Sequence, residues 1–122
     1  MMGGDRVAMA AVMGVVLLMA LGQLMFKATA VSWQLHGTLL APAPALRLLG
    51  SLVVYGVATL AWIWVLQRVP LTIAYPIVAL TFVLVPLGAW WLYDESLGLR
   101  YVAGMLLIVG GIIVATWRSP VL

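Results

Sequence analysis

Gln23 and Lys27 are the polar pair best placed to do chemistry in this otherwise apolar chain. They are four residues apart, so on a helix they project from the same face, about one turn from each other. An ammonium group beside an amide donor suits a phosphate ligand. The structural alternative is that Lys27 extends toward water and Gln23 bonds to a neighbouring helix. The sequence leaves both interpretations open.

Aromatic and hydroxyl side chains form a second set of candidates. Tyr55, Thr59 and Trp62 stand at positions i, i+4 and i+7, which is one stripe on a helix. Such a stripe could line a groove for a prenyl chain or a sugar ring, although helix packing is the commoner use of aromatic residues at this spacing. Tyr75 and Thr81 supply further hydroxyl groups, and we include them in the candidate binding site.

Pro76 and Pro86 lie in one apolar stretch, and each removes a backbone donor. We expect them to kink or loosen a helix and to leave carbonyl groups free to face a cavity. A bent helix is a natural moving part of a transporter, so both prolines are candidate conformational residues.

The acidic pair Asp94 and Glu95 has two interpretations. It could handle protons or take part in catalysis, but a solvated turn that caps the next helix or meets Arg100 explains it without either role. The chain has a single histidine, His36, and no cysteine. This set is too small for most hydrolytic machinery or for a cysteine or histidine metal site. We therefore expect a protein that is not an enzyme and needs no cofactor.

The composition indicates that the candidate residues lie on helices inside a membrane. Of 122 residues, 66% are hydrophobic and 7% are charged, a balance that a small soluble domain could not bury. The charged residues separate four apolar stretches near the length of about 20 residues that spans a bilayer. Unbroken apolar runs argue against the alternation of a β-barrel. We predict an all-α integral membrane protein, a single four-helix domain over residues 1–122, with helices at about 7–30, 46–67, 70–93 and 100–118.

The connections between these helices define two faces. Residues 31–46 contain two prolines and a glycine and are predicted to form the longest loop, while the other connections are tight. The basic residues then divide three against three: Arg6, Arg68 and Arg118 against Lys27, Arg47 and Arg100. The positive-inside rule therefore chooses no orientation. The net charge of +3 is scattered, which argues against a nucleic-acid partner.

Four helices of this size are expected to fill their own centre and to leave little room for a private cavity. A pathway forms more easily between two copies, so we expect a dimer. Gly104, Gly110 and Gly111 give the last predicted helix a smooth surface that another helix could approach closely. These glycines are the candidate dimer contact.

Two segments carry a family resemblance: LGQLMFKATA at Leu21–Ala30, and the long stretch Val65–Trp117, which includes VLQRVPLTIAYP. They contain the patterns G-Q-x-x-x-K and L-Q-x-V-P-x-x-I-A-Y-P, followed by an acidic turn at Glu95. In these patterns the chain resembles the small drug/metabolite transporter superfamily and, within it, the ArnE/ArnF family of small flippase subunits. The resemblance covers most of the chain except residues 31–46.

The resemblance implies a flippase subunit that works as a homodimer or heterodimer. Its cargo would be an undecaprenyl-phosphate-linked aminoarabinose lipid, moved across the bacterial inner membrane for lipid A modification. A groove in the dimer could hold the phosphate or the sugar with Lys27, Gln23 and Tyr75. The lipid tail would stay in the bilayer against Trp62 and Tyr55.

Two other functions stay open. The small multidrug resistance transporters share this architecture but need a glutamate in their first helix, and counting along the motif from Lys27 puts that position at Met19. A thioether neither titrates nor attracts a cation, so an exporter of cationic drugs is disfavoured, whereas the lysine favours an anionic cargo. The third function is that of an assembly subunit without a cargo site of its own.

Overall fold

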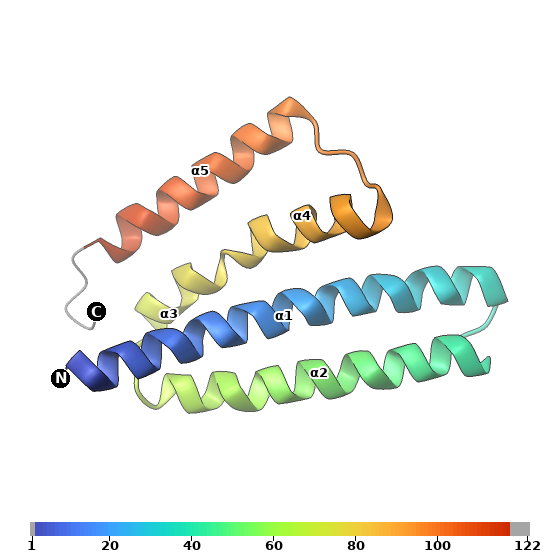
Figure 1. Cartoon of the computed structure of the whole chain (residues 1–122), viewed down its shortest axis with the longest axis horizontal. Helices are drawn as coiled ribbons and strands as arrows, with labels where there is room; N and C mark the ends of the chain where they lie inside the picture. The colour runs from blue at the N-terminus through green and yellow to red at the C-terminus, as the bar shows by residue number, and fades with distance from the viewer. Residues whose placement is uncertain (1, 118–122) are drawn as a thin grey trace.

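The computed structural model describes residues 2–117, and this part of the chain consists of helices and their connections (Figure 1). The helices are α1 (Met2–His36), α2 (Pro42–Leu66), α3 (Leu71–Val78), α4 (Thr81–Tyr93) and α5 (Leu99–Thr116). Four segments are long and apolar enough to cross a membrane: Arg6–His36, Pro42–Leu66, Leu71–Tyr93 and Leu99–Thr116. The predicted all-α fold with four spans is confirmed. Arg118, the predicted end of the last helix, lies outside the described residues.

The predicted long loop over residues 31–46 is wrong. Helix α1 continues to His36, and α2 already begins at Pro42, so the connection is only Gly37 to Ala41. Proline is tolerated in the first turn of a helix because the amide hydrogen that it lacks would have no partner inside the helix. Gly37 ends α1 with a left-handed φ of 74°, a conformation that costs glycine little.

The third span is broken into α3 and α4 at Ala79 and Leu80, between the two prolines of this segment. The backbone tightens at the break, where the amide of Leu80 donates to the carbonyl of Ile77 at 3.0 Å. The hydroxyl of Thr81 donates to the carbonyl of Val78 at 2.9 Å. A side-chain donor therefore takes up a backbone acceptor that the break leaves near the helix end.

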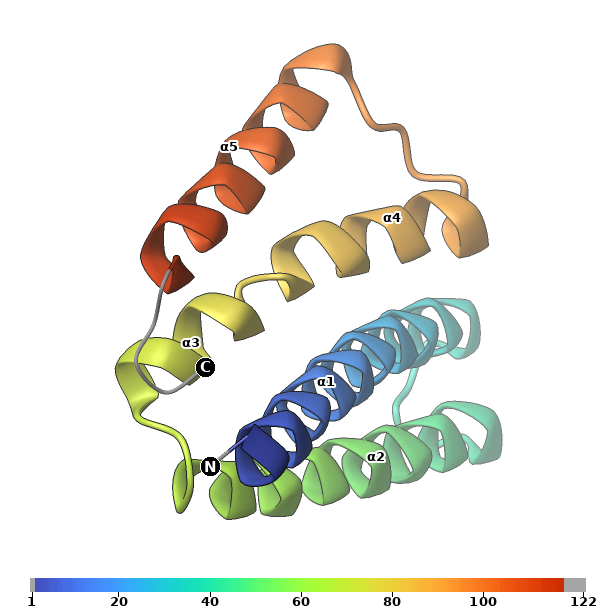
Figure 2. The same cartoon turned by 60° about the vertical axis from the view of Figure 1, so that its left-hand side comes forward.

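The core lies where α1, α2 and α3 meet. Its buried residues are Ala8, Val12, Val15, Val16, Val65, Val69, Ala74 and Ile77. Helices α1 and α2 run antiparallel and lie side by side along their lengths (Figures 1 and 2). Gly22 permits the close approach, because a Cβ atom at this position would lie 2.6 Å from Cδ2 of Tyr55. Further along the pair, the buried hydroxyls of Thr29 and Ser51 share a hydrogen bond of 3.3 Å.

Helix α5 is the least covered span. It packs mainly against α3 and α4, on the side away from α1 and α2 (Figure 2). Within the most apolar window of each span, 33% of residues are buried in α1 but only 6% in α5. Most of the surface of α5 is thus left to lipid or to another chain.

The connections show where the membrane boundaries lie along α1. The N-terminus and the connection from α2 to α3 share one end of the molecule, and the connections from α1 to α2 and from α4 to α5 share the opposite end (Figure 1). Ala8 packs near the first end with Val69, and Lys27 contacts the turn after α4 at the other. At 1.5 Å per residue, Ala8 and Lys27 are about 28 Å apart, close to the roughly 30 Å of a bilayer's hydrocarbon core. This spacing predicts that Lys27 lies near one boundary of the apolar layer.

Candidate functional site

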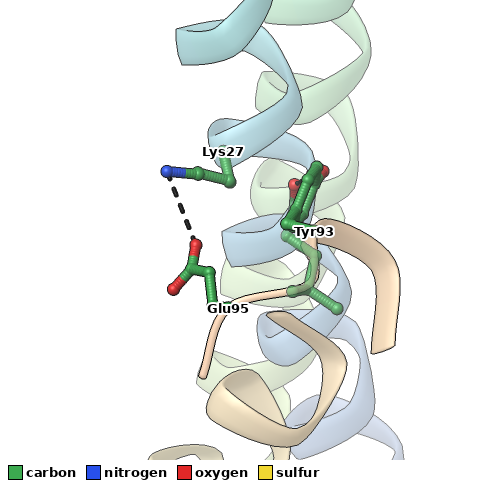
Figure 3. Close-up of polar contacts among 4 residues, drawn as sticks. Lys27, Tyr93 and Glu95 are labelled. Atoms are coloured by element: carbon green, nitrogen blue, oxygen red, sulfur yellow. Dashed lines mark hydrogen bonds and ion pairs between the residues drawn. The ribbon is translucent and has the colours of Figure 1, made fainter. Parts of the chain in front are cut away.

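Lys27 forms an ion pair with Glu95 in the turn between α4 and α5 (Figure 3). The Nζ atom lies 3.5 Å from Oε2, and the two side chains are 47% and 48% exposed. Asp94 ends α4 with a left-handed φ of 57°, and the amide of Glu95 donates to the carbonyl of Ala89 at 3.4 Å. The expectation that the acidic pair caps the next helix or meets Arg100 is wrong for Glu95. Its partner is Lys27, and the N-cap of α5 is Gly98, without a side-chain cap.

Tyr93 fixes the end of α4 against α1. Its hydroxyl donates to the carbonyl of Leu24 at 2.7 Å. Leu24 also packs against Gly88, where a Cβ atom would lie 2.6 Å from Cδ1 of the leucine. These two contacts hold the turn that carries Glu95 beside the helix that carries Lys27.

An open groove of about 490 Å³ lies beside Lys27. It is lined by Lys27, Ala30, Trp33, Gln34 and Gly37. Lys27, Ala30 and Gln34 follow the spacing i, i+3 and i+7 of one helical face. Sequence reasoning missed Trp33 and Gln34 as site residues because it ended the first helix near residue 30. The same spacing would have found Gln34 had the helix been continued.

A second cavity, of about 430 Å³, lies between α1, α4 and α5. Three of the predicted residues, Gln23, Thr81 and Pro86, line it together. Pro86 has no amide hydrogen, so the carbonyl of Phe82, also in the lining, has no helical donor four residues further on. Tyr101 completes the polar lining, and sequence reasoning missed it. The side-chain amide of Gln23 also donates from Nε2 to the hydroxyl of Tyr55 on α2, at 3.4 Å.

An apolar cavity of about 580 Å³ adjoins the second one and shares Phe82 and Tyr101 with it. Its other lining residues are Gly98, Arg100, Gly104, Met105 and Ile108. Both hollows are open to the outside, so neither is a cavity enclosed by one chain, and the expectation of a pathway between two copies stays a prediction. The packing of α5 against α3 and α4, with little contact to α1 and α2, leaves these hollows beside α5.

Three further candidates do not line the groove or these two cavities: Thr59, Trp62 and Tyr75. Thr59 donates to the carbonyl of Tyr55 at 2.9 Å. Trp62 packs against the core and against Tyr75, with ring centroids 6.4 Å apart. Tyr75 is itself 64% exposed. The predicted binding residues are thus distributed over three places on the chain rather than gathered in one groove.

The three candidate glycines of α5 have no other part of the chain packed against them. A Cβ atom at Gly104, Gly110 or Gly111 would meet nothing within 4 Å. Gly104 lines the apolar cavity, and Gly110 and Gly111 are exposed. Their role as a dimer contact stays a prediction.

Met19, at the position of the missing glutamate, packs against the core. In the described part of the chain, no group of three histidine, cysteine or acidic side chains is placed to hold a metal ion. Among the described residues, the groove and the two cavities offer the ammonium group of Lys27 with its partner Glu95, the amides of Gln23 and Gln34, the hydroxyls of Thr81 and Tyr101, and the guanidinium of Arg100.

The sequence model of the EamA-like transporter family matches residues 4–117. A relative from Pseudomonas aeruginosa (strain UCBPP-PA14), named probable 4-amino-4-deoxy-L-arabinose-phosphoundecaprenol flippase subunit ArnE, is 39% identical over 110 residues, which are 85% of this chain and 92% of the relative. A relative of the same name from Proteus mirabilis (strain HI4320) is 32% identical over 103 residues, 84% and 91% of the two chains.

A third relative of this name, from Sodalis glossinidius (strain morsitans), is 56% identical over 62 residues. This match covers 51% of the chain and 56% of the relative, so it spans about half of each protein. No solved structure matches the chain. The four apolar spans and the match along nearly the whole sequence make this a multi-pass membrane protein that belongs to the EamA-like transporter family.

Proposed function

We propose that this chain is a subunit of a flippase in the bacterial inner membrane. Its cargo is 4-amino-4-deoxy-L-arabinose-phosphoundecaprenol, moved from the cytoplasmic to the periplasmic leaflet for lipid A modification. The names of relatives that match most of the chain support this substrate. Residues 1–122 act as a single transmembrane domain, and the polar head crosses the membrane without covalent chemistry or a cofactor.

The observation that carries the proposal is the position of Lys27. Lys27 lines an open groove, and we place its ammonium group near the boundary of the apolar layer. The phosphate of a polyprenyl lipid lies at this depth too, because it joins the buried tail to the polar sugar. The groove volume of about 490 Å³ falls within the range of roughly 300–1,000 Å³ that is usual for small-ligand sites. The exposed indole of Trp33 offers a flat surface for the sugar.

The cavity lined by Gln23 and Thr81 continues this path into the membrane. Lys27 and Gln23 are one helical turn apart on α1, and Gln23 lines the cavity between α1, α4 and α5. Polar partners there lower the cost of taking a sugar head through hydrocarbon. The tail stays in lipid, against Tyr55 and Trp62.

The broken third span supplies the movement. Helices α3 and α4 meet at Ala79 and Leu80, and one carries Pro76 while the other carries Pro86. A change in the angle at this break alters the cavity between α4 and α5. Tyr75, one residue before Pro76, moves with α3.

A second small subunit, identical or similar to this one, completes the transporter. Helix α5 has little coverage within the chain, and Gly110 and Gly111 leave its surface open to close approach. An exporter of cationic drugs has less support, because Met19 is uncharged and packed against the core.

The test is transport of the labelled lipid in proteoliposomes that contain the full chain, alone and with the second small subunit of its organism. We expect Lys27→Ala to lower the initial rate about tenfold, the effect of losing one charge-assisted hydrogen bond. Lys27→Arg keeps the charge and retains most of the rate. Unchanged transport by Lys27→Ala contradicts the proposed headgroup site.

Two further measurements separate the alternatives. Gln23→Ala is expected to lower the rate without abolishing it, because the cavity keeps the hydroxyls of Thr81 and Tyr101. Resistance of cells to toxic cations, measured with and without a pH gradient, should not depend on the chain. A rate that the second subunit supplies alone, without this chain, would instead favour an assembly role.

A further inference from the structure

The ion pair between Lys27 and Glu95 presents opposite charges side by side at the edge of the groove. Lys27 extends from α1 and Glu95 from the turn after α4, and their charged ends point toward each other (Figure 3). Each is about half exposed, at 47% and 48%. Glu95 is not among the residues that line the groove, but its Oε2 atom lies 3.5 Å from Nζ of Lys27. The carboxylate is therefore within reach of a ligand that binds this ammonium group.

The contact leaves both groups able to bind a ligand. At 3.5 Å it is longer than the roughly 2.7–2.9 Å of a well-formed charge-assisted hydrogen bond. An ammonium group has three donors, and a carboxylate has about four acceptor positions. One long contact uses a small part of this capacity.

The fold holds the carboxylate in place from two directions. Tyr93, two residues before Glu95, is bonded to the carbonyl of Leu24 on α1 at 2.7 Å. Asp94, between Tyr93 and Glu95, ends α4 with a left-handed φ of 57°. Such a conformation is uncommon for a residue other than glycine. Together the bond of Tyr93 and the left-handed end of α4 keep the turn that carries Glu95 next to α1.

We propose that Glu95 determines the specificity of this site by binding the ammonium group of the sugar, while Lys27 binds the phosphate. This inference rests on the proposed function. The cargo named for the relatives carries an amine on its sugar and a phosphate on the other side of the same ring. Its head is therefore dipolar, and the paired charges of Lys27 and Glu95 match it. Lipids with a phosphate but without an amine match only half of the site.

The experiment compares two lipids in the proteoliposome assay with the full chain and the second small subunit. One is 4-amino-4-deoxy-L-arabinose-phosphoundecaprenol, and the other is the same lipid with its amine acetylated, which removes one positive charge. We expect the wild type to prefer the free amine by about threefold to tenfold, the contribution of one charge-assisted contact at a partly exposed position.

Glu95→Gln should remove this preference by slowing transport of the amine lipid while the acetylated lipid keeps its rate. Asp94→Asn is the matched control, because it removes the neighbouring carboxylate from the same turn, and it should keep the preference. The double variant Lys27→Glu/Glu95→Lys exchanges the two charges and so keeps an ion pair between α1 and the turn. If the pair is only structural, this variant should keep the wild-type preference for the amine lipid. If the pair recognises the cargo, the preference should be lost.

Equal slowing of both lipids by Glu95→Gln, or a preserved preference, overturns the role of Glu95. A wild type that transports both lipids at the same rate overturns this inference and leaves the flippase function standing. A wild type that transports neither lipid overturns the proposed function, and the inference with it.

Discussion

Tyr93 and Leu24 show how one hydroxyl group connects two distant parts of the chain. The donor and the acceptor are 69 residues apart, and the bond is 2.7 Å long. It joins the last turn of α4 to the helix that carries the candidate phosphate ligand. The charge pair beside it depends on this alignment, because Glu95 follows Tyr93 by only two residues.

Replacing Tyr93 with phenylalanine deletes this hydrogen bond and keeps the ring. We expect the free energy of unfolding to fall by about 0.5–1.5 kcal/mol, the usual net contribution of such a bond. Thermal unfolding of the purified protein in detergent measures the change. Tyr75→Phe is the control, because that side chain is 64% exposed and should cost less. Equal losses in the two variants would show that the hydroxyl of Tyr93 has no special role.

At the level of helices, Gly22 and Tyr55 determine how closely α1 and α2 approach. The added Cβ atom of an alanine would lie 2.6 Å from the tyrosine ring, so the ring or the helix has to move. The hydroxyl of Tyr55 accepts a hydrogen bond from Gln23, and its ring packs against Phe26 at a centroid distance of 5.5 Å. The position of Gln23 in the second cavity is therefore tied to this glycine.

Gly22→Ala should destabilise the protein by about 1–3 kcal/mol, as overpacking in a tight interface does. Gly14→Ala is a matched control on the same helix, because its Cβ atom would meet nothing within 4 Å. In Gly14→Ala the greater helix propensity of alanine should raise the free energy of unfolding by up to about 1 kcal/mol. Denaturation in detergent with increasing sodium dodecyl sulfate gives both values. Equal stability of the two variants would contradict the close contact.

The whole molecule is unevenly packed. The core joins α1, α2 and α3, whereas α5 leaves most of its surface uncovered. Two cavities lie on the side of α5, where α4 and α5 diverge. The core lies toward the N-terminal end of α1, whereas the groove of Lys27 lies at the other end, beside the bond from Tyr93 to Leu24. The loosely packed side at α5 has room to change shape and to receive another subunit.

Leucine at both Gly110 and Gly111 should prevent a second subunit from approaching α5. We expect the purified particle to fall in mass to that of one chain, measured by light scattering with the detergent subtracted. Gly56→Leu is the control, because Gly56 is also exposed with nothing within 4 Å but lies on α2. A double variant that keeps the mass of the wild-type particle would exclude this surface as the subunit contact.

The sequence by itself determined that the chain spans a membrane four times and that Gln23 and Lys27 share a face of the first helix. These properties depend on composition and on spacing over one or two helical turns. Both are local, so they do not depend on how the helices pack. The sequence also located the two prolines between which the third span breaks. Its error at residues 31–46 came from treating Pro42 and Pro44 as helix breakers, although prolines in a first turn begin a helix.

Only the tertiary structure decided which distant groups meet. The pairing of Lys27 with Glu95 and the bond from Tyr93 to Leu24 depend on how α4 returns along α1. The separation of Trp62 and Tyr75 from the cavity of Gln23 and Thr81 depends on how α3, α4 and α5 pack. No local pattern encodes such contacts, because they follow from the packing of whole helices, whose angles and offsets are set by many side chains together.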